Sequence, residues 1–144
     1  MSQNVKFDQH FMINKGLLKI IAKTISPKDN ERILEIGPGH GELTELLNAK
    51  NLTLIEIDKQ LANKLKSKFP NYNILNKNAL EENLMKYNKY IGNLPYNICE
   101  PLFNKLIRTK FKEAVFVLPK TFITQGLMSY LTKDFFNLKI IQDI

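Results

Sequence analysis

Several residue types are scarce in this sequence of 144 residues. It contains one cysteine, Cys99, two histidines and no tryptophan. A single cysteine excludes an internal disulfide framework and is consistent with a reducing compartment. No cysteine and histidine residues lie at the spacing of metal ligands, so we expect no metal site.

Long apolar runs are missing as well. No run approaches the roughly 18 residues that a membrane span requires. The N-terminus lacks the charged start, the long apolar stretch and the small-residue cleavage site of a signal peptide. From these absences we expect a cytoplasmic protein that does not act at a membrane.

The composition is that of a folded protein, with 44% hydrophobic and 24% charged residues. The length suits one domain over residues 1–144, with an N-terminal arm at residues 1–13. The net charge is +7, and residues 1–72 carry 11 basic and 8 acidic side chains against 10 and 6 in the remainder. This even spread favours a polyanionic partner such as nucleic acid, although a lysine-rich surface that serves solubility explains it equally well.

Apolar periodicity predicts strands that alternate with helices. The expected strands cover residues 32–36, 52–57, 72–75, 87–92, 113–118 and 138–144. One expected helix follows its cap Asn14, carries its apolar face on residues 17–25 and ends before Pro27. Further helices are expected at residues 43–49, 59–69, 100–108, with Pro101 in its first turn, and 121–132, and a helical turn or short helix is expected at 79–85. This alternation indicates an α/β fold, with a mostly parallel sheet and helices on both faces.

A glycine-rich loop follows the first expected strand. Gly37, Gly39 and Gly41 let the backbone turn sharply and approach a ligand closely, and the flanking strand and helix are typical of a nucleotide-binding loop. Glu56 lies 19 positions after Gly37, at the end of the second strand. It could accept hydrogen bonds from both hydroxyls of a ribose, or it could be a solvated acid at a strand end. Glu35 either contacts the ligand or anchors the loop.

A second motif, Asn93-Leu94-Pro95-Tyr96, follows the fourth expected strand. The side-chain carbonyl of Asn93 and the backbone carbonyl of Leu94, held by Pro95, could accept both hydrogens of an exocyclic amine. Tyr96 offers a flat face on which a flipped-out base could stack. Loops at the carboxyl ends of parallel strands face one crevice, so we expect cofactor and base to meet there. The same tetrapeptide also occurs in ordinary turns.

These motifs resemble those of the ribosomal RNA adenine dimethyltransferases, the KsgA-like and Erm-like enzymes. The most specific pieces are LEIGPGHGELT at residues 34–44, IEID at 55–58 and GNLPYNI at 92–98, and the N-terminal Gln9-His10-Phe11 matches as well. The resemblance runs from Phe7 to about Ile144. It implies a Rossmann-like class I methyltransferase domain. The glycine-loop sequence looks more like the KsgA-like branch, whose members dimethylate two adjacent adenosines of small-subunit rRNA.

The resemblance also implies a cofactor, S-adenosyl-L-methionine, and a set of contacts. Asn93 and Tyr96 would hold the target adenine. The expected cofactor-binding residues are Gln9, His10, Met12, Gly37, Gly39, Glu56, Asn78, Ala79 and Asn93. His10 could instead cap the first helix. The expected activity is transfer of the sulfonium methyl group to adenine N6, with in-line alignment as the main requirement.

Three departures from the family pattern stand out. Asn78 occupies the position of an aspartate that accepts a hydrogen bond from the cofactor's adenine amine; its carbonyl could still accept, without the charge. The segment at residues 118–122 lacks the family's glutamate. The chain ends before the final antiparallel strand and the C-terminal helical domain. An open edge near Leu138 and Ile144 would favour self-association or a separate C-terminal partner, unless the chain is truncated.

Two other functions remain open at this point. A DNA adenine methyltransferase would use a similar base-binding motif, and a catalytically weak rRNA-binding assembly factor would fit the three departures. A basic run also has two interpretations, as a solvated helix end or as a phosphate contact beside the base. Its residues are Lys105, Arg108, Lys110 and Lys112.

Overall fold

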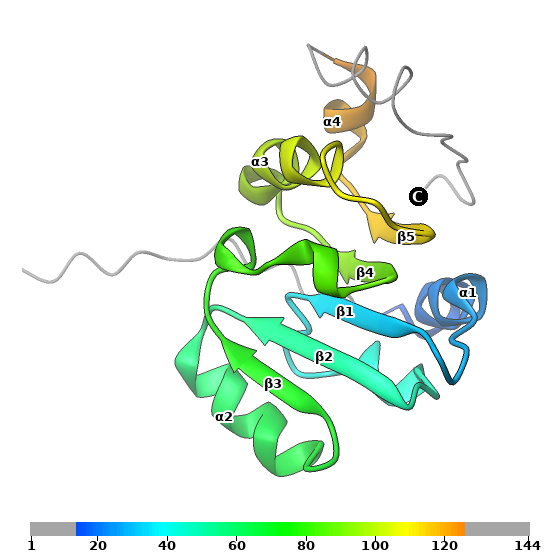
Figure 1. Cartoon of the computed structure of the whole chain (residues 1–144), viewed down its shortest axis with the longest axis vertical. Helices are drawn as coiled ribbons and strands as arrows, with labels where there is room; N and C mark the ends of the chain where they lie inside the picture. Colours follow the sequence, from blue (N-terminus) through cyan, green and yellow to red (C-terminus); the bar gives the residue numbers. More distant parts are fainter. Residues whose placement is uncertain (1–13, 126–144) are drawn as a thin grey trace, which may run out of the picture.

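A parallel sheet of five strands forms the centre of the computed structural model, which describes residues 14–125 (Figure 1). The strands are β1 (Arg32–Ile36), β2 (Asn51–Glu56), β3 (Asn73–Asn76), β4 (Lys89–Asn93) and β5 (Glu113–Val117). They lie in the order β3-β2-β1-β4-β5, and every neighbouring pair is parallel. The predicted parallel α/β sheet is therefore confirmed, while the strand expected at 138–144 lies outside the described residues.

Helices cover both faces of this sheet. The α-helices are α1 (Lys15–Ile25), α2 (Lys59–Lys68), α3 (Tyr96–Leu106) and α4 (Lys120–Thr124), and the 3₁₀ turns are η1 (Thr44–Leu46), η2 (Ala79–Glu81) and η3 (Leu84–Lys86). The side chains of α1 and α2 share one buried cluster with Ile33 of β1, and those of α3 and α4 share the other with Leu34 and Ile36. Alternate residues of the central strand thus enter opposite cores, as strand geometry requires.

Caps set the starts of the helices that pack on the first face. The Asn14 side chain accepts a hydrogen bond from the Leu17 N–H at 3.2 Å, as predicted for a helix that begins here. Asp58 accepts from the N–H groups of Gln60 and Leu61 at the start of α2. Because Asp58 follows β2 almost directly, this cap fixes the chain at the carboxyl end of that strand.

The helix expected at residues 43–49 is wrong, because only the short turn η1 forms there. Leu43 and Leu47 are buried as predicted, but Leu46 is exposed. The chain must return along the whole length of β2, roughly 20 Å, in the ten residues after Gly41. An α-helix of ten residues spans only about 15 Å, so part of this segment has to be extended. The helical turn or short helix expected at 79–85 is present as two 3₁₀ turns, η2 and η3.

Helix α3 begins at Tyr96, four residues earlier than the predicted start at residue 100. Pro101 therefore lies inside the helix, not in its first turn, and its missing N–H leaves the carbonyl of Asn97 without a helical partner. The earlier start brings the first turn of α3 directly against the end of β4. The predicted helix at 121–132 is described only as far as Thr124, as α4.

Charged side chains are paired at the amino end of the sheet. The Lys89 ammonium, only 6% exposed, lies 3.0 Å from the Glu31 carboxylate and donates to the Ile25 carbonyl at 2.8 Å. Lys112 approaches the second oxygen of Glu31 at 3.2 Å. Burial alone would raise the pKa of Glu31, but hydrogen bonds from Lys89, Lys112 and the Lys28 N–H hold it at about 2. These contacts join α1, β4 and the segment before β5.

Candidate functional site

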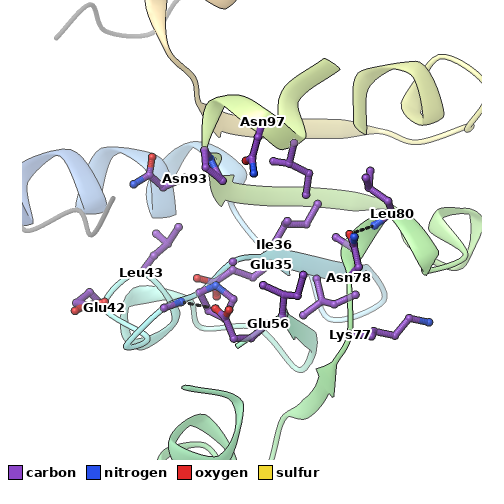
Figure 2. Close-up of a pocket in the computed structure, with 18 of the residues that line it drawn as sticks. Glu35, Ile36, Glu42, Leu43, Glu56, Lys77, Asn78, Leu80, Asn93 and Asn97 are labelled. Atoms are coloured by element: carbon purple, nitrogen blue, oxygen red, sulfur yellow. Dashed lines mark hydrogen bonds between the residues drawn. The ribbon is translucent and has the colours of Figure 1, made fainter. Parts of the chain in front are cut away.

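A cavity of about 220 Å³ opens at the carboxyl ends of the strands. The chain crosses from β1 to β2 on one side and reaches β4 on the other, so the strand order reverses between β1 and β4. Open α/β sheets bind ligands at this switch point. The wall comes from the loops after β1, β2, β3 and β4, as Figure 2 shows. The sequence-based expectation of one shared crevice therefore agrees with the geometry.

The glycine loop forms the floor of the cavity. Gly37, Gly39 and Gly41 have φ angles of 65°, 60° and 86°. Residues other than glycine rarely adopt this backbone conformation. A Cβ on Gly37 would meet no atom within 4 Å, whereas one on Gly41 would lie 2.5 Å from the Phe69 ring. Gly37 thus faces the open cavity and Gly41 faces the packed helix α2.

Glu56, the last residue of β2, is 4% exposed and lines the cavity beside this loop. One carboxylate oxygen accepts from the Gly39 N–H at 3.2 Å, a hydrogen bond drawn in Figure 2, and the other accepts from the Asp58 N–H at 3.0 Å. Burial raises the pKa of Glu56, and the two backbone hydrogen bonds act against that rise. Glu56 is therefore a buried acid held in place by the loop, and the interpretation as a solvated strand-end acid is wrong.

Glu35 is also buried and lines the cavity from β1. The Thr44 hydroxyl donates a hydrogen bond to it at 2.8 Å, which ties η1 to the sheet beneath the glycine loop. Burial raises the pKa of Glu35 to about 8, with the Thr44 hydrogen bond opposing and the charge of Glu42 adding to the rise. Glu35 thus anchors the loop, as one of the two interpretations expected, and holds its proton at neutral pH.

The motif Asn93-Leu94-Pro95-Tyr96 crosses from β4 into α3. Asn93 and Pro95 line the cavity. Leu94 is buried, and its N–H donates to the Val117 carbonyl at 3.0 Å, which ties the turn to β5. The Tyr96 side chain is 59% exposed at the first position of α3. The motif therefore places one amide in the cavity and one aromatic ring on the surface.

Asn78 and Ala79 line the opposite part of the cavity, after β3. The Asn78 side-chain oxygen accepts a hydrogen bond from the Leu80 N–H at 3.0 Å and so caps η2 (Figure 2). Lys77 lines the cavity beside it and forms an ion pair with Glu82 at 2.8 Å. The expected cofactor residues Gln9, His10 and Met12 lie outside the described residues.

Other wall residues were missed by the sequence analysis. Glu42, Ile57, Asn97 and Ile98 all line the cavity. Asn97 and Ile98 could have been found from their position directly after the tetrapeptide, had α3 been predicted to begin at Tyr96. Ile57 directly follows Glu56 and is 44% exposed, an unusual exposure for isoleucine that suits an apolar ligand surface.

Two of the four residues in the basic run have internal roles. The Lys105 ammonium donates to the backbone carbonyls of Leu80 and Glu82, the latter at 2.8 Å, and links α3 to η2. Lys112 pairs with Glu31 at the amino end of the sheet. These two side chains are therefore not available for a phosphate contact. Arg108 and Lys110 are exposed, and only they could make one.

Cys99 is fully buried within α3, and its thiol donates to the Pro95 carbonyl at 3.3 Å. Burial raises its pKa to about 11, so it is a packing residue, as predicted.

Among residues 14–125, no group of three or more His, Cys, Asp or Glu side chains is arranged to hold a metal ion. No helix in the same range is long and apolar enough to cross a bilayer.

The strand order and the cavity at the switch point define a Rossmann-like fold of the kind found in methyltransferases. A dimethyladenosine transferase from Plasmodium falciparum superposes with a TM-score of 0.72 and 33% identity, over 78% of this chain and 44% of that one. The 23S rRNA methyltransferase ErmE gives a TM-score of 0.64 and 26% identity, over 74% of this chain and 45% of that one.

The sequence comparisons lead to one family. The family model described as ribosomal RNA adenine dimethylase matches residues 1–142, and the chain belongs to this family. A ribosomal RNA small subunit methyltransferase A from Fusobacterium nucleatum is 42% identical over 115 residues, which cover 73% of this chain and 44% of that protein. The chain spans about half the length of the curated relatives it matches.

Proposed function

We propose that this chain is the cofactor-binding and catalytic part of an S-adenosyl-L-methionine-dependent adenine N6-methyltransferase that acts on small-subunit rRNA. The observation that carries the proposal is that Glu56 and Asn93 line one cavity, on either side of a glycine loop. The family and the names of the relatives support the reaction class and the substrate.

The residues of the cavity fit this cofactor. The open space over Gly37 leaves room for a ligand against the backbone. The Glu56 carboxylate, buried and held by two backbone N–H groups, can accept hydrogen bonds from two ribose hydroxyls. Ile57 offers an apolar surface to a purine ring, and Asn78 and Ala79 lie where the ring would end. When bound, the cofactor supplies a methyl group already activated by its sulfonium charge.

The chain's own residues would then position the acceptor. The Asn93 side-chain carbonyl and the Leu94 backbone carbonyl accept the two hydrogens of the adenine amine, which holds the nitrogen lone pair toward the methyl donor. Pro95 fixes that backbone, and the exposed Tyr96 ring stacks against the extruded base. Extrusion of a base costs a few kcal/mol, less in a single-stranded target, so loops of rRNA are suitable substrates.

Methylation of isolated small ribosomal subunits that lack the modification tests this proposal, with the product nucleosides separated by mass. We expect N6-methylated adenosines from the wild type. Asn93→Ala should lower turnover on the order of 100-fold, because alignment is lost, and should keep the affinity for S-adenosylhomocysteine within about threefold. Asn63→Ala, an exposed amide on α2, is the matched control. Normal turnover in Asn93→Ala would refute the role of Asn93.

One observation favours a second candidate, a catalytically weak rRNA-binding assembly factor. The Asn78 carbonyl is already engaged with the Leu80 N–H, so it has less capacity to accept from a cofactor amine. Calorimetric titration with S-adenosylhomocysteine separates the two candidates. Saturable binding supports the enzyme, and no heat of binding at millimolar ligand supports the assembly factor. Parallel assays on duplex DNA separate the RNA enzyme from a DNA adenine methyltransferase.

A further inference from the structure

The orientation of the Asn78 side-chain amide is fixed by a hydrogen bond from the backbone two residues later. Its oxygen caps η2 by accepting from the Leu80 N–H at 3.0 Å. A carboxamide ends in one oxygen and one NH₂ group, so the terminal atom left over is Nδ2, which can only donate. Within residues 14–125 this NH₂ group makes no hydrogen bond, and Asn78 lines the cavity. The side chain therefore has a free donor for a ligand.

The position of Asn78 indicates which part of a ligand it would meet, and this step rests on the proposed function. Figure 2 shows Asn93 and Asn78 on opposite sides of the cavity and Glu56 at its lower edge. A nucleoside whose ribose lies at Glu56 and whose reactive end faces Asn93 must direct its base toward Asn78. The sugar is attached to N9, so the far edge of the purine carries N1 and the substituent at position 6.

The charges of the cavity agree with a donor at this end. Besides Glu35 of β1, which holds its proton, the acidic side chains of the wall are Glu42 in the loop after β1 and Glu56 at the end of β2. Lys77 is the charged wall residue next to Asn78, and its own carboxylate partner, Glu82, also binds Lys86. The wall next to Asn78 thus carries a cation, while Glu42 and Glu56 lie in other parts of the cavity wall.

We propose that residue 78 of this chain presents a hydrogen-bond donor to position 6 of the bound purine. A 6-amino group is itself a donor there and gains no hydrogen bond from Asn78, whereas a 6-oxo group would accept one from Nδ2. The cavity should therefore bind an inosyl ligand at least as tightly as an adenosyl ligand. An aspartate at position 78 would cap η2 with one oxygen and turn the other to the purine, which reverses the preference.

Calorimetry on the full chain tests this with S-adenosylhomocysteine and its 6-oxo counterpart, S-inosylhomocysteine. The measured quantity is the ratio of the inosyl to the adenosyl dissociation constant. We expect a ratio of about one or below for the wild type. Asn78→Asp should raise the ratio about tenfold or more, since a charged acceptor gains the amine and repels the oxo group. Asn73→Asp makes the same charge change on exposed β3 and should leave the ratio unchanged.

The outcomes are distinguishable. A wild-type ratio above about thirtyfold, or a ratio that Asn78→Asp does not change, would overturn the inference and leave the proposed cofactor intact. No binding of S-adenosylhomocysteine to either the wild type or Asn78→Asp would overturn the proposed function, and this inference with it. Thermal unfolding of each variant checks the fold, which Asp at an N-cap position should preserve.

Discussion

Buried carboxyl groups at the two ends of the sheet have pKa values that are shifted in opposite directions. At the amino end, Glu31 is 2% exposed and two lysines lie within 3.2 Å of it, so its pKa is about 2. At the carboxyl end, Glu35 and Glu56 are as deeply buried, but they accept hydrogen bonds from a hydroxyl and from backbone N–H groups, and burial raises both pKa values. The difference agrees with a stabilising role for the ion pairs at the amino end and with the ligand site proposed at the carboxyl end.

Removing the cation at the amino end should have the largest effect. Lys89→Met leaves Glu31 buried without its nearest partner and removes the hydrogen bond to the Ile25 carbonyl. We expect a loss of about 3–5 kcal/mol in the free energy of unfolding. Urea unfolding of Lys89→Met and of Lys64→Met, an exposed control on α2, measures it. Equal stability of the two variants would contradict the role of the pair.

Neutralising Glu35 should change how stability depends on pH. Between its ordinary pKa of 4.5 and its folded value of about 8, Glu35 keeps a proton that the unfolded chain releases. Its contribution is therefore complete below pH 4.5 and is lost as pH rises toward 8, by at most about 1.4 kcal/mol per pH unit. Glu35→Gln should abolish this slope. Parallel stability curves for variant and wild type at pH 5, 6.5 and 8 would contradict the raised pKa.

Glu56→Gln should lower the affinity for the ligand more than it lowers the stability of the fold. The new NH₂ group cannot accept from a hydroxyl, nor from the N–H groups that Glu56 now binds. We expect about tenfold weaker binding of S-adenosylhomocysteine, and Glu45→Gln on the surface is the matched control. The pKa of Glu56 is raised, so wild-type affinity should fall as pH drops toward that value, and the variant should show no such fall. A wild-type profile as flat as the variant's would exclude the carboxylate as the acceptor.

Lys105→Met should give the smallest effect, and it tests whether the hydrogen bonds from Lys105 to η2 contribute to ligand binding. The variant loses the hydrogen bonds to the carbonyls of Leu80 and Glu82, which hold η2 beside the cavity. We expect roughly threefold weaker ligand binding, because a net hydrogen bond contributes about 1 kcal/mol and part of it is regained from water. Lys110→Met, exposed after α3, is the control. Identical affinities would show that η2 keeps its shape without Lys105.

The strands and the glycine loop could be predicted because their signals are local. β1 covers the predicted residues 32–36, and the other described strands differ from prediction by a few residues at their ends. The glycines at 37, 39 and 41 have positive φ angles, which agree with the sharp turn predicted for this loop. Because parallel strands end at one edge, the meeting of the glycine loop and Asn93 at one cavity also followed from the order of elements, whereas Asn78 was expected there from the family resemblance alone.

The errors came from information that the local pattern lacks. Leu43, Leu46 and Leu47 fit a helical face, but the length of β2 decides the path of that segment. Lys105 and Lys112 look like a surface run, and only the fold brings them to carbonyls 23 and 25 residues away and to a carboxylate 81 residues away. The orientation of the Asn78 amide depends on an N–H two residues later, which requires η2 to form.

The tie made by Lys105 has a mechanical consequence. It joins the helix that starts beside Asn93 to the turn that carries Asn78, so the two walls of the cavity are braced across their gap. These hydrogen bonds fix the distance between the two walls. The width of the cavity is therefore set by the protein before a ligand binds.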